Sequence, residues 1–133
     1  MVPPAPVENA LKTSPYITNA VLLGDKRRFI AALIVPNFVN VQARAKENGV
    51  ILNTPAEMAK DPWVHRLIES EIARLTARSA QYETIKRFAL LDHDLTFDRG
   101  ELTYTLKLKR RVIDEHYADV IDRLYAEASP AHS

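Results

Sequence analysis

Residues 99–111, RGELTYTLKLKRR, combine hydroxyl and ammonium groups at a regular spacing. Leucine and tyrosine alternate there with Thr103, Thr105, Lys107 and Lys109. In an extended segment, residues two apart share a face, so these polar side chains are expected to point the same way. A lysine places a compact charge on a long stem, and threonine hydroxyls can donate to the same anion. The pattern predicts either a phosphate or carboxylate site, or a solvent-facing strand edge whose lysines oppose aggregation.

Arg110 and Arg111 close this basic run without the pattern of a nucleic-acid contact. Adjacent residues cannot both face one way on a helix. No aromatic residues alternate with the arginines to stack on bases. The net charge of +1 provides no overall attraction to a polyanion. A solvated helix start is the favoured interpretation, and no nucleic-acid partner is predicted.

Metal and nucleotide sites lack the residues that they need. His65 and Glu69 are four residues apart, and residues 92–94 place a histidine between two carboxylates, but a metal site needs three or four converging ligands. The absence of cysteine excludes a thiolate ligand or nucleophile. The three glycines are scattered, whereas a backbone cradle for a triphosphate requires a glycine-rich loop. We predict no metal, and any phosphate that Lys107 meets must be held by another domain.

The elements that position the basic stretch follow from hydrophobic periodicity and capping residues. Two apolar runs separated by DKRR predict an antiparallel hairpin. Thr54 with Glu57, and Asp61 before Pro62, have the spacing of helix N-caps. The order predicts a small α+β sandwich, with a three-stranded, mainly antiparallel sheet flanked by helices. The predicted strands are 17–24, 29–36 and 87–92, and the predicted helices begin near residues 6, 37, 55 and 62, with one final helix containing residues 113–124.

Length and composition predict one domain over residues 1–133, with 47% hydrophobic and 26% charged residues. Residues 129–133, SPAHS, are expected to form a disordered tail. No apolar run approaches the roughly 20 residues that span a bilayer. A chain without cysteine suits a reducing cytoplasm, where we expect the protein. The sequence opens on prolines and runs at once into a helical pattern, so we expect it to be part of something longer.

Three segments carry a resemblance that covers nearly the whole chain: PAPVENALKTSPYI, AVLLGDKRRFIAALIVPNF and YETIKRFALLDHDLTFDRGELTYTLKLKRRVI. In this order they resemble the first helix, the hairpin and the catalytic-lysine segment of one domain. That domain is the C-terminal domain of long-chain fatty-acid–CoA ligases, members of the adenylate-forming acyl-CoA synthetase superfamily.

The resemblance implies a two-step reaction. A fatty-acid carboxylate attacks the α-phosphate of ATP, with Mg²⁺ as cofactor, to give an acyl-adenylate and pyrophosphate; coenzyme A then displaces AMP. Alignment of TYTLKLKRR with the family motif makes Lys107 the catalytic lysine, which would neutralise charge between carboxylate and α-phosphate. Thr105, Arg110 and Arg111 are the further substrate-binding candidates, the arginines for coenzyme A phosphates or for contact with the large domain. The C-terminal domain is implied to swing between the half-reactions and to present another face to coenzyme A.

Two positions depart from the superfamily motif. Tyr104 stands where proline is common, and Leu106, as in the long-chain branch, stands where many members have glycine. The chain begins after the hinge motif, so the expected partner is the large N-terminal domain that binds ATP and the acyl group. By resemblance the full-length enzyme is cytoplasmic, and peripheral membrane contact is compatible with it. The alternative is a stand-alone interaction module that docks its basic strand and helix start on an acidic protein surface.

Overall fold

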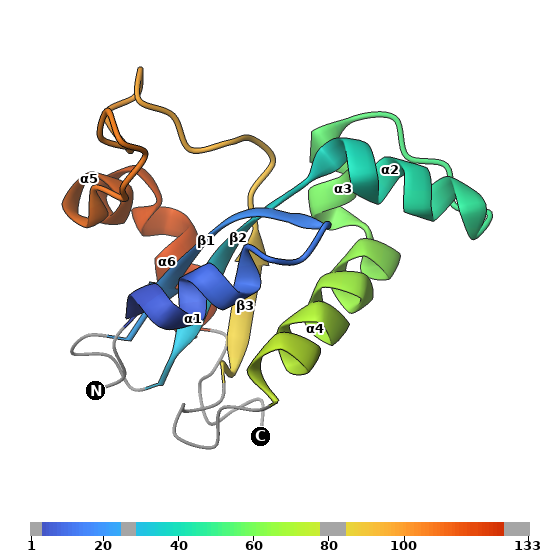
Figure 1. The fold of residues 1–133 in the computed structure, drawn as a ribbon, viewed down its shortest axis with the longest axis horizontal. Coiled ribbons are helices and arrows are strands. Elements are labelled where there is room, and N and C mark those ends of the chain that lie inside the picture. The colour runs from blue at the N-terminus through green and yellow to red at the C-terminus, as the bar shows by residue number, and fades with distance from the viewer. Residues whose placement is uncertain (1–3, 25–28, 78–84, 127–133) are drawn as a thin grey trace.

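The computed structural model describes residues 4–24, 29–77 and 85–126, which form a sheet with helices on both faces (Figure 1). The predicted α+β class is confirmed. None of the described helices is both long enough and apolar enough to cross a membrane. The elements are α1 Pro4–Leu11, β1 Ile17–Leu23, β2 Ala31–Pro36, α2 Phe38–Glu47, α3 Pro55–Lys60, α4 Pro62–Thr76, β3 Arg87–Leu90, α5 Arg110–His116 and α6 Ala118–Ala126.

The sheet has the order β1-β2-β3 in the described ranges. β1 and β2 are antiparallel, with Ala20 opposite Ile34, so the predicted hairpin is confirmed, while its DKRR turn lies outside the described residues. β3 runs parallel to β2, with Leu33 opposite Ala89. The chain returns to the sheet through α2, α3 and α4, a crossover long enough for parallel pairing. Every residue of β2 is buried, as expected of a central strand covered on both faces.

Alternate residues of the strands divide the core into two apolar layers, because successive strand side chains point to opposite faces. One layer joins Ile34 to Ile68 of α4 and to α1. The other joins the opposite face of the sheet to α5 and α6, with Ile113 fully buried. Leu95 and Leu102, which follow β3, belong to this second layer. The segment that carries Lys107 is therefore anchored on the α5–α6 side of the sheet.

Side-chain caps begin α3 and α4, as the sequence predicts. The Asp61 carboxylate accepts from the Trp63 N–H at 2.8 Å. The Thr54 hydroxyl accepts from the Glu57 N–H at 3.1 Å, and the Glu57 carboxylate accepts from the Asn53 N–H at 3.1 Å. In a capping box the glutamate accepts from the N–H of the N-cap residue itself. Here Glu57 accepts instead from the N–H of Asn53, the residue before the cap. These caps satisfy N–H groups that a helix start otherwise leaves without partners.

The predicted single final helix is wrong, because two helices, α5 and α6, meet at Tyr117 (Figure 1). The φ and ψ of Tyr117 are −113° and 22°, outside the α-helical range. Its ring is buried, and its hydroxyl donates to the Glu101 carboxylate at 2.8 Å. The apolar period continues through the junction, with Ile113 and Ile121 both buried. Periodicity alone therefore gives no sign of the break, which coincides with a contact to a residue far earlier in the chain.

Candidate functional site

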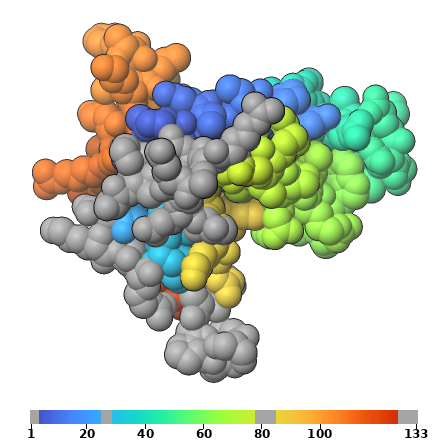
Figure 2. All heavy atoms as spheres, turned by 60° about the horizontal axis from the view of Figure 1, so that its bottom comes forward, coloured from blue at the N-terminus to red at the C-terminus, as the bar shows by residue number. Residues whose placement is uncertain are grey.

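The segment between β3 and α5 carries the predicted lysine and projects from the body of the domain (Figure 1). In Figure 2 its orange atoms extend beyond the blue atoms of α1. We call residues 102–108 the lysine loop. The strand-edge alternative does not hold: outside the named strands the described structure has a single bridge, between Leu102 and Leu108. The alternating segment folds back on itself, so its two ends pair with each other and form no ladder with the sheet.

A four-residue turn, Thr103 to Leu106, forms the tip of the lysine loop. The Leu106 N–H donates to the Thr103 carbonyl at 2.8 Å, and the Thr103 N–H donates to the Lys107 carbonyl at 2.9 Å. Leu106 has a φ of 65°, alone among the described non-glycine residues in having a positive value. This conformation costs an L-residue about 1–2 kcal/mol. Glycine suits this position because it adopts the same φ without that cost.

Lys107 follows the turn and is exposed. Its backbone N–H donates to the Thr103 hydroxyl at 3.1 Å. Within the described ranges its ammonium group forms no ion pair or hydrogen bond. The hydrogen-bonded turn fixes the backbone from which the long side chain extends. This arrangement can deliver one positive charge to an anion outside the domain.

Thr105 shares the tip with Lys107. It is exposed, and its hydroxyl oxygen lies 3.2 Å from the Thr103 hydroxyl oxygen. Both hydroxyls can donate to an anion that approaches the lysine, because a hydroxyl rotates to suit its partner. Thr105 and Lys107 thus lie on the same loop and each contacts Thr103, while their contacts with substrate stay a prediction.

The two arginines do not join this tip. The guanidinium of Arg110, the first residue of α5, contacts the Glu8 carboxylate at 2.7 and 2.8 Å. The Arg111 side chain is 93% exposed and lies 3.7 Å from Glu115. Their divergence is confirmed, as expected of adjacent helical residues. Binding of substrate by either arginine stays a prediction, and the structure gives Arg110 a partner inside the domain.

An aromatic pair flanks the lysine loop, and the sequence patterns do not predict it. The rings of Phe97 and Tyr104 stack with centroids 4.6 Å apart at an interplanar angle of 24°. They remain 47% and 87% exposed, and Leu106 beside them is 67% exposed. Such a pair contributes about 0.5–1.5 kcal/mol beyond its buried area. Because Tyr104 belongs to the turn, the stack is expected to stabilise the turn without contributing to the core.

Glu101 lies at the base of the lysine loop and is 1% exposed. Its carboxylate accepts from the Tyr117 hydroxyl at 2.8 Å and from the Thr96 N–H at 3.2 Å, and the His116 Nδ1 lies 2.8 Å away. Burial raises the pKa of this carboxyl, but the hydrogen bonds and the nearby Arg99 charge hold the pKa below its ordinary value. The loop base therefore holds an ionised carboxylate. No sequence pattern indicated it, since its side-chain partners come from separate turns and helices.

The family described as AMP-binding enzyme C-terminal domain matches residues 1–129. This match extends over almost the entire sequence. The chain belongs to that family.

The AMP-binding C-terminal domain is similar to parts of two long-chain-fatty-acid–CoA ligases. It is 32% identical over 146 residues to ACSBG2 of Gallus gallus and 33% identical over 125 residues to FadD15 of Mycobacterium tuberculosis. The alignments cover 96% and 93% of this chain, but 19% and 21% of those ligases. The chain thus spans about a fifth of the length of these relatives.

Two solved adenylation domains of carboxylic acid reductases share the fold of the AMP-binding C-terminal domain. The domain from Segniliparus rugosus, in complex with AMP and a co-purified carboxylic acid, has a TM-score of 0.76 at 19% identity, covering 96% of this chain and 18% of that chain. The domain from Mycobacterium chelonae has a TM-score of 0.71 at 21% identity, covering 92% and 17%. At these identities the likeness shows the fold alone.

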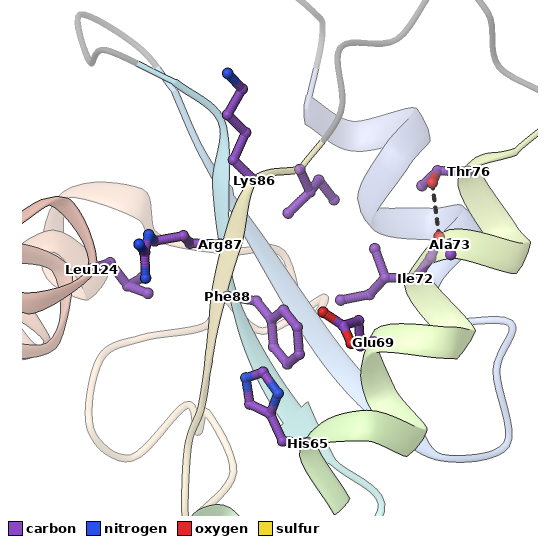
Figure 3. A pocket seen from close by; sticks show the side chains of 10 residues that line it. His65, Glu69, Ile72, Ala73, Thr76, Lys86, Arg87, Phe88 and Leu124 are labelled. Atoms are coloured by element: carbon purple, nitrogen blue, oxygen red, sulfur yellow. Dashed lines mark hydrogen bonds between the residues drawn. The ribbon is translucent and has the colours of Figure 1, made fainter. Parts of the chain in front are cut away.

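A cavity of about 410 Å³ opens between α4 and β3 of the AMP-binding C-terminal domain (Figure 3). Its lining includes His65 and Glu69, and the His65 ring stacks on Phe88 with centroids 4.2 Å apart. In Figure 3, Arg87 points away from Phe88, toward Leu124. None of the described lining residues belongs to the lysine loop. Across the described ranges, no group of three or more histidine, aspartate or glutamate residues could hold a metal ion.

Proposed function

We propose that this domain is the mobile C-terminal domain of an ATP-dependent long-chain fatty acid–CoA ligase and supplies Lys107 for acyl-adenylate formation. Support comes from the family match over residues 1–129 and from the ligases that are 32% and 33% identical to the chain. One observation carries the proposal. Lys107 is exposed on a hydrogen-bonded turn, and its ammonium group has no partner in the described part of the chain.

The first half-reaction brings two anions together, the fatty-acid carboxylate and the α-phosphate of ATP. A carboxylate oxygen forms a bond to the α-phosphorus, and the bond from that phosphorus to pyrophosphate breaks. A positive charge held between the approaching oxygens lowers their repulsion. Lys107 supplies this charge, and the Thr105 hydroxyl donates to the same oxygens. Loss of one such preorganised group costs about 10²–10³ in rate.

ATP and Mg²⁺ are assigned to the partner domain of the full-length ligase. The described residues include no group of three or more histidine, cysteine, aspartate or glutamate residues that fits a metal ion. The chain's three glycines form no phosphate-cradling loop. The AMP-binding C-terminal domain therefore contributes a cation and a moving surface, while the larger domain holds the nucleotide.

In the second half-reaction the coenzyme A thiol displaces AMP from the acyl-adenylate. The domain rotates between the two steps, so that Lys107 withdraws and another face meets coenzyme A. Arg111, with a 93% exposed side chain, contributes positive charge to this mobile surface. Arg110 contributes as a fixed charge, because Glu8 holds its guanidinium.

The test is Lys107→Ala in the full-length ligase, with the two half-reactions measured separately. Acyl-adenylate formation, followed by pyrophosphate release, is expected to fall about 10²–10³-fold. Thioester formation from supplied acyl-adenylate and coenzyme A is expected to persist. Lys109→Ala is the matched control, since Lys109 is another exposed lysine only two residues away. Equal loss in both half-reactions, or an equal effect of Lys109→Ala, contradicts the role of Lys107.

The stand-alone interaction module has less support. That hypothesis requires a basic strand that docks on an acidic protein surface, whereas residues 102–108 form a turned loop. The reading frame upstream of Met1 distinguishes the two hypotheses. A large glycine-containing domain encoded there is the ligase expectation, and a frame that ends at Met1 favours the interaction module.

A further inference from the structure

Glu101 directly precedes the lysine loop and forms a backbone hydrogen bond with Lys109, which directly follows it. Its N–H donates to the Thr96 carbonyl at 3.0 Å, and its carbonyl accepts from the Lys109 N–H at 2.8 Å. Its carboxylate accepts from the Tyr117 hydroxyl at 2.8 Å. We propose that Glu101 is a positioning residue for Lys107, because it ties the base of the lysine loop to the junction of α5 and α6. This inference rests on the proposed function of Lys107.

A short series of contacts leads from Glu101 to Lys107. Leu102, the next residue, forms the bridge to Leu108. Thr103 then binds Lys107 twice, donating its N–H to the Lys107 carbonyl at 2.9 Å and accepting the Lys107 N–H on its hydroxyl at 3.1 Å. Hydrogen bonds and the bridge thus join the two arms of the loop from base to tip. A displacement of Glu101 moves the backbone that carries the lysine.

Tyr117, which donates to the Glu101 carboxylate, is held by core packing. The Tyr117 ring is buried in the second core layer with Ile113 and Ile121. Its hydroxyl lies between the Glu101 carboxylate and the His93 Nε2, each 2.8 Å away. Core packing leaves such a ring little freedom to move. The carboxylate is therefore held against the better-packed part of the domain.

Stability alone does not require a carboxylate at this position. An ionised group at 1% exposure is costly to bury unless every lone pair finds a donor. A well-packed apolar side chain often stabilises as much as a buried charge. What the carboxylate adds is directional bonds that fix the geometry, from Thr96 within the preceding turn and from His116 and Tyr117 at the helix junction. A misplacement of about 1 Å at a reacting group costs about a hundredfold in rate.

The experiment uses Glu101→Gln and Tyr117→Phe in the full-length ligase, with both half-reactions measured. Glu101→Gln is expected to slow acyl-adenylate formation about tenfold to a hundredfold while sparing thioester formation from supplied acyl-adenylate. Tyr117→Phe removes one donor and keeps the buried ring, so a smaller loss in the same half-reaction is expected. Tyr117→Phe therefore tests the positioning role if Glu101→Gln fails to fold.

A second arm repeats both substitutions in the Lys107→Ala background. If Glu101 acts through Lys107, neither substitution slows adenylation further there, because coupled residues are not additive. Glu71→Gln is the matched control. Its carboxylate on α4 accepts from Ser14 at 2.6 Å and Arg74 at 2.8 Å, away from the lysine loop. It is expected to leave both half-reactions within about twofold.

Three outcomes overturn the positioning role: equal loss in both half-reactions, the same fractional loss with and without Lys107, or no loss from either substitution. These outcomes leave the proposed function intact if Lys107→Ala by itself slows adenylation and spares thioester formation. If Lys107→Ala leaves adenylation unchanged, the proposed function fails first. The single lysine substitution therefore separates the two failures.

Discussion

The Glu8 carboxylate and the Arg110 guanidinium form a two-contact ion pair, with distances of 2.7 and 2.8 Å, across 102 positions of sequence. Glu8 is 4% exposed and also accepts from the Leu22 N–H at 2.6 Å. The pair joins α1 and β1 to the first turn of α5, directly after the lysine loop. It holds the start of α5, next to the end of the loop that Glu101 also contacts through the Lys109 N–H.

Removal of Arg110 is expected to destabilise the domain. Among the described residues, Arg110→Ala leaves the buried Glu8 carboxylate with the Leu22 N–H as its remaining donor. Loss of one partner from a fully buried pair costs about 3–5 kcal/mol. Because the Arg110 side chain is 42% exposed, water screens part of the interaction, and we expect a loss of about 2 kcal/mol. The free energy of urea unfolding measures it. Arg111→Ala, at a neighbouring exposed arginine, is expected to cost less than about 0.5 kcal/mol; similar losses for both would rule out a special contribution of the Glu8 pair.

Leu106 is expected to respond to substitution through its backbone. Leu106→Val should lower the free energy of unfolding by about 1 kcal/mol or more, because a β-branched residue tolerates a φ of 65° poorly. Leu106→Gly should be neutral or stabilising, since it removes the strain but raises the entropy of the unfolded chain. Thermal unfolding gives the comparison. Ile51→Val is the control, because Ile51 is 65% exposed and Leu106 67%, without positive φ at Ile51. A larger loss of stability from Ile51→Val than from Leu106→Val would contradict backbone strain at Leu106.

Local chemistry predicted most of the helices and strands. The run that forms β2 is buried throughout, and Thr54 and Asp61 begin helices by the expected side-chain contacts. These features depend on residues close together in the sequence, so composition and spacing carry the information. Helix caps and the burial of a central strand can therefore be inferred from the amino-acid sequence.

The candidate site depends on contacts between separate elements, which cannot be inferred from the spacing of residues in the sequence. The alternation around Lys107 is typical of a strand, yet a positive φ at Leu106 turns the chain and pairs Leu102 with Leu108. The exposed position of Lys107 agrees with the motif, while Glu101 gave no signal. The hydrogen-bond partners of its carboxylate lie 5 to 16 residues away in elements that only the fold brings together.

The Phe97–Tyr104 stack is expected to stabilise the lysine loop measurably. A double-mutant cycle of Phe97→Ala and Tyr104→Ala should give a coupling free energy of about 0.5–1.5 kcal/mol in unfolding. Both rings are exposed, so each single substitution should cost little buried area. Tyr104→Phe keeps the stacked ring and serves as the control, with a loss below about 0.5 kcal/mol. Strict additivity of the two alanine substitutions would mean that the rings merely lie near each other.

The stability of the domain is expected to depend on pH through Glu101. Burial raises the pKa of this carboxyl, but hydrogen bonds from His116, Tyr117 and Thr96 outweigh it, so the folded pKa lies below the ordinary value of 4.5. A carboxyl with a lowered folded pKa contributes its full stability above the unfolded pKa and loses it as the pH falls through the folded pKa. Glu101→Gln cannot titrate. The difference in unfolding free energy between the wild type and Glu101→Gln should therefore shrink as the pH falls from about 5 through the folded pKa of Glu101. Urea titrations below about pH 5 measure the difference, and one that grew on acidification there would mean that the folded domain prefers the protonated carboxyl.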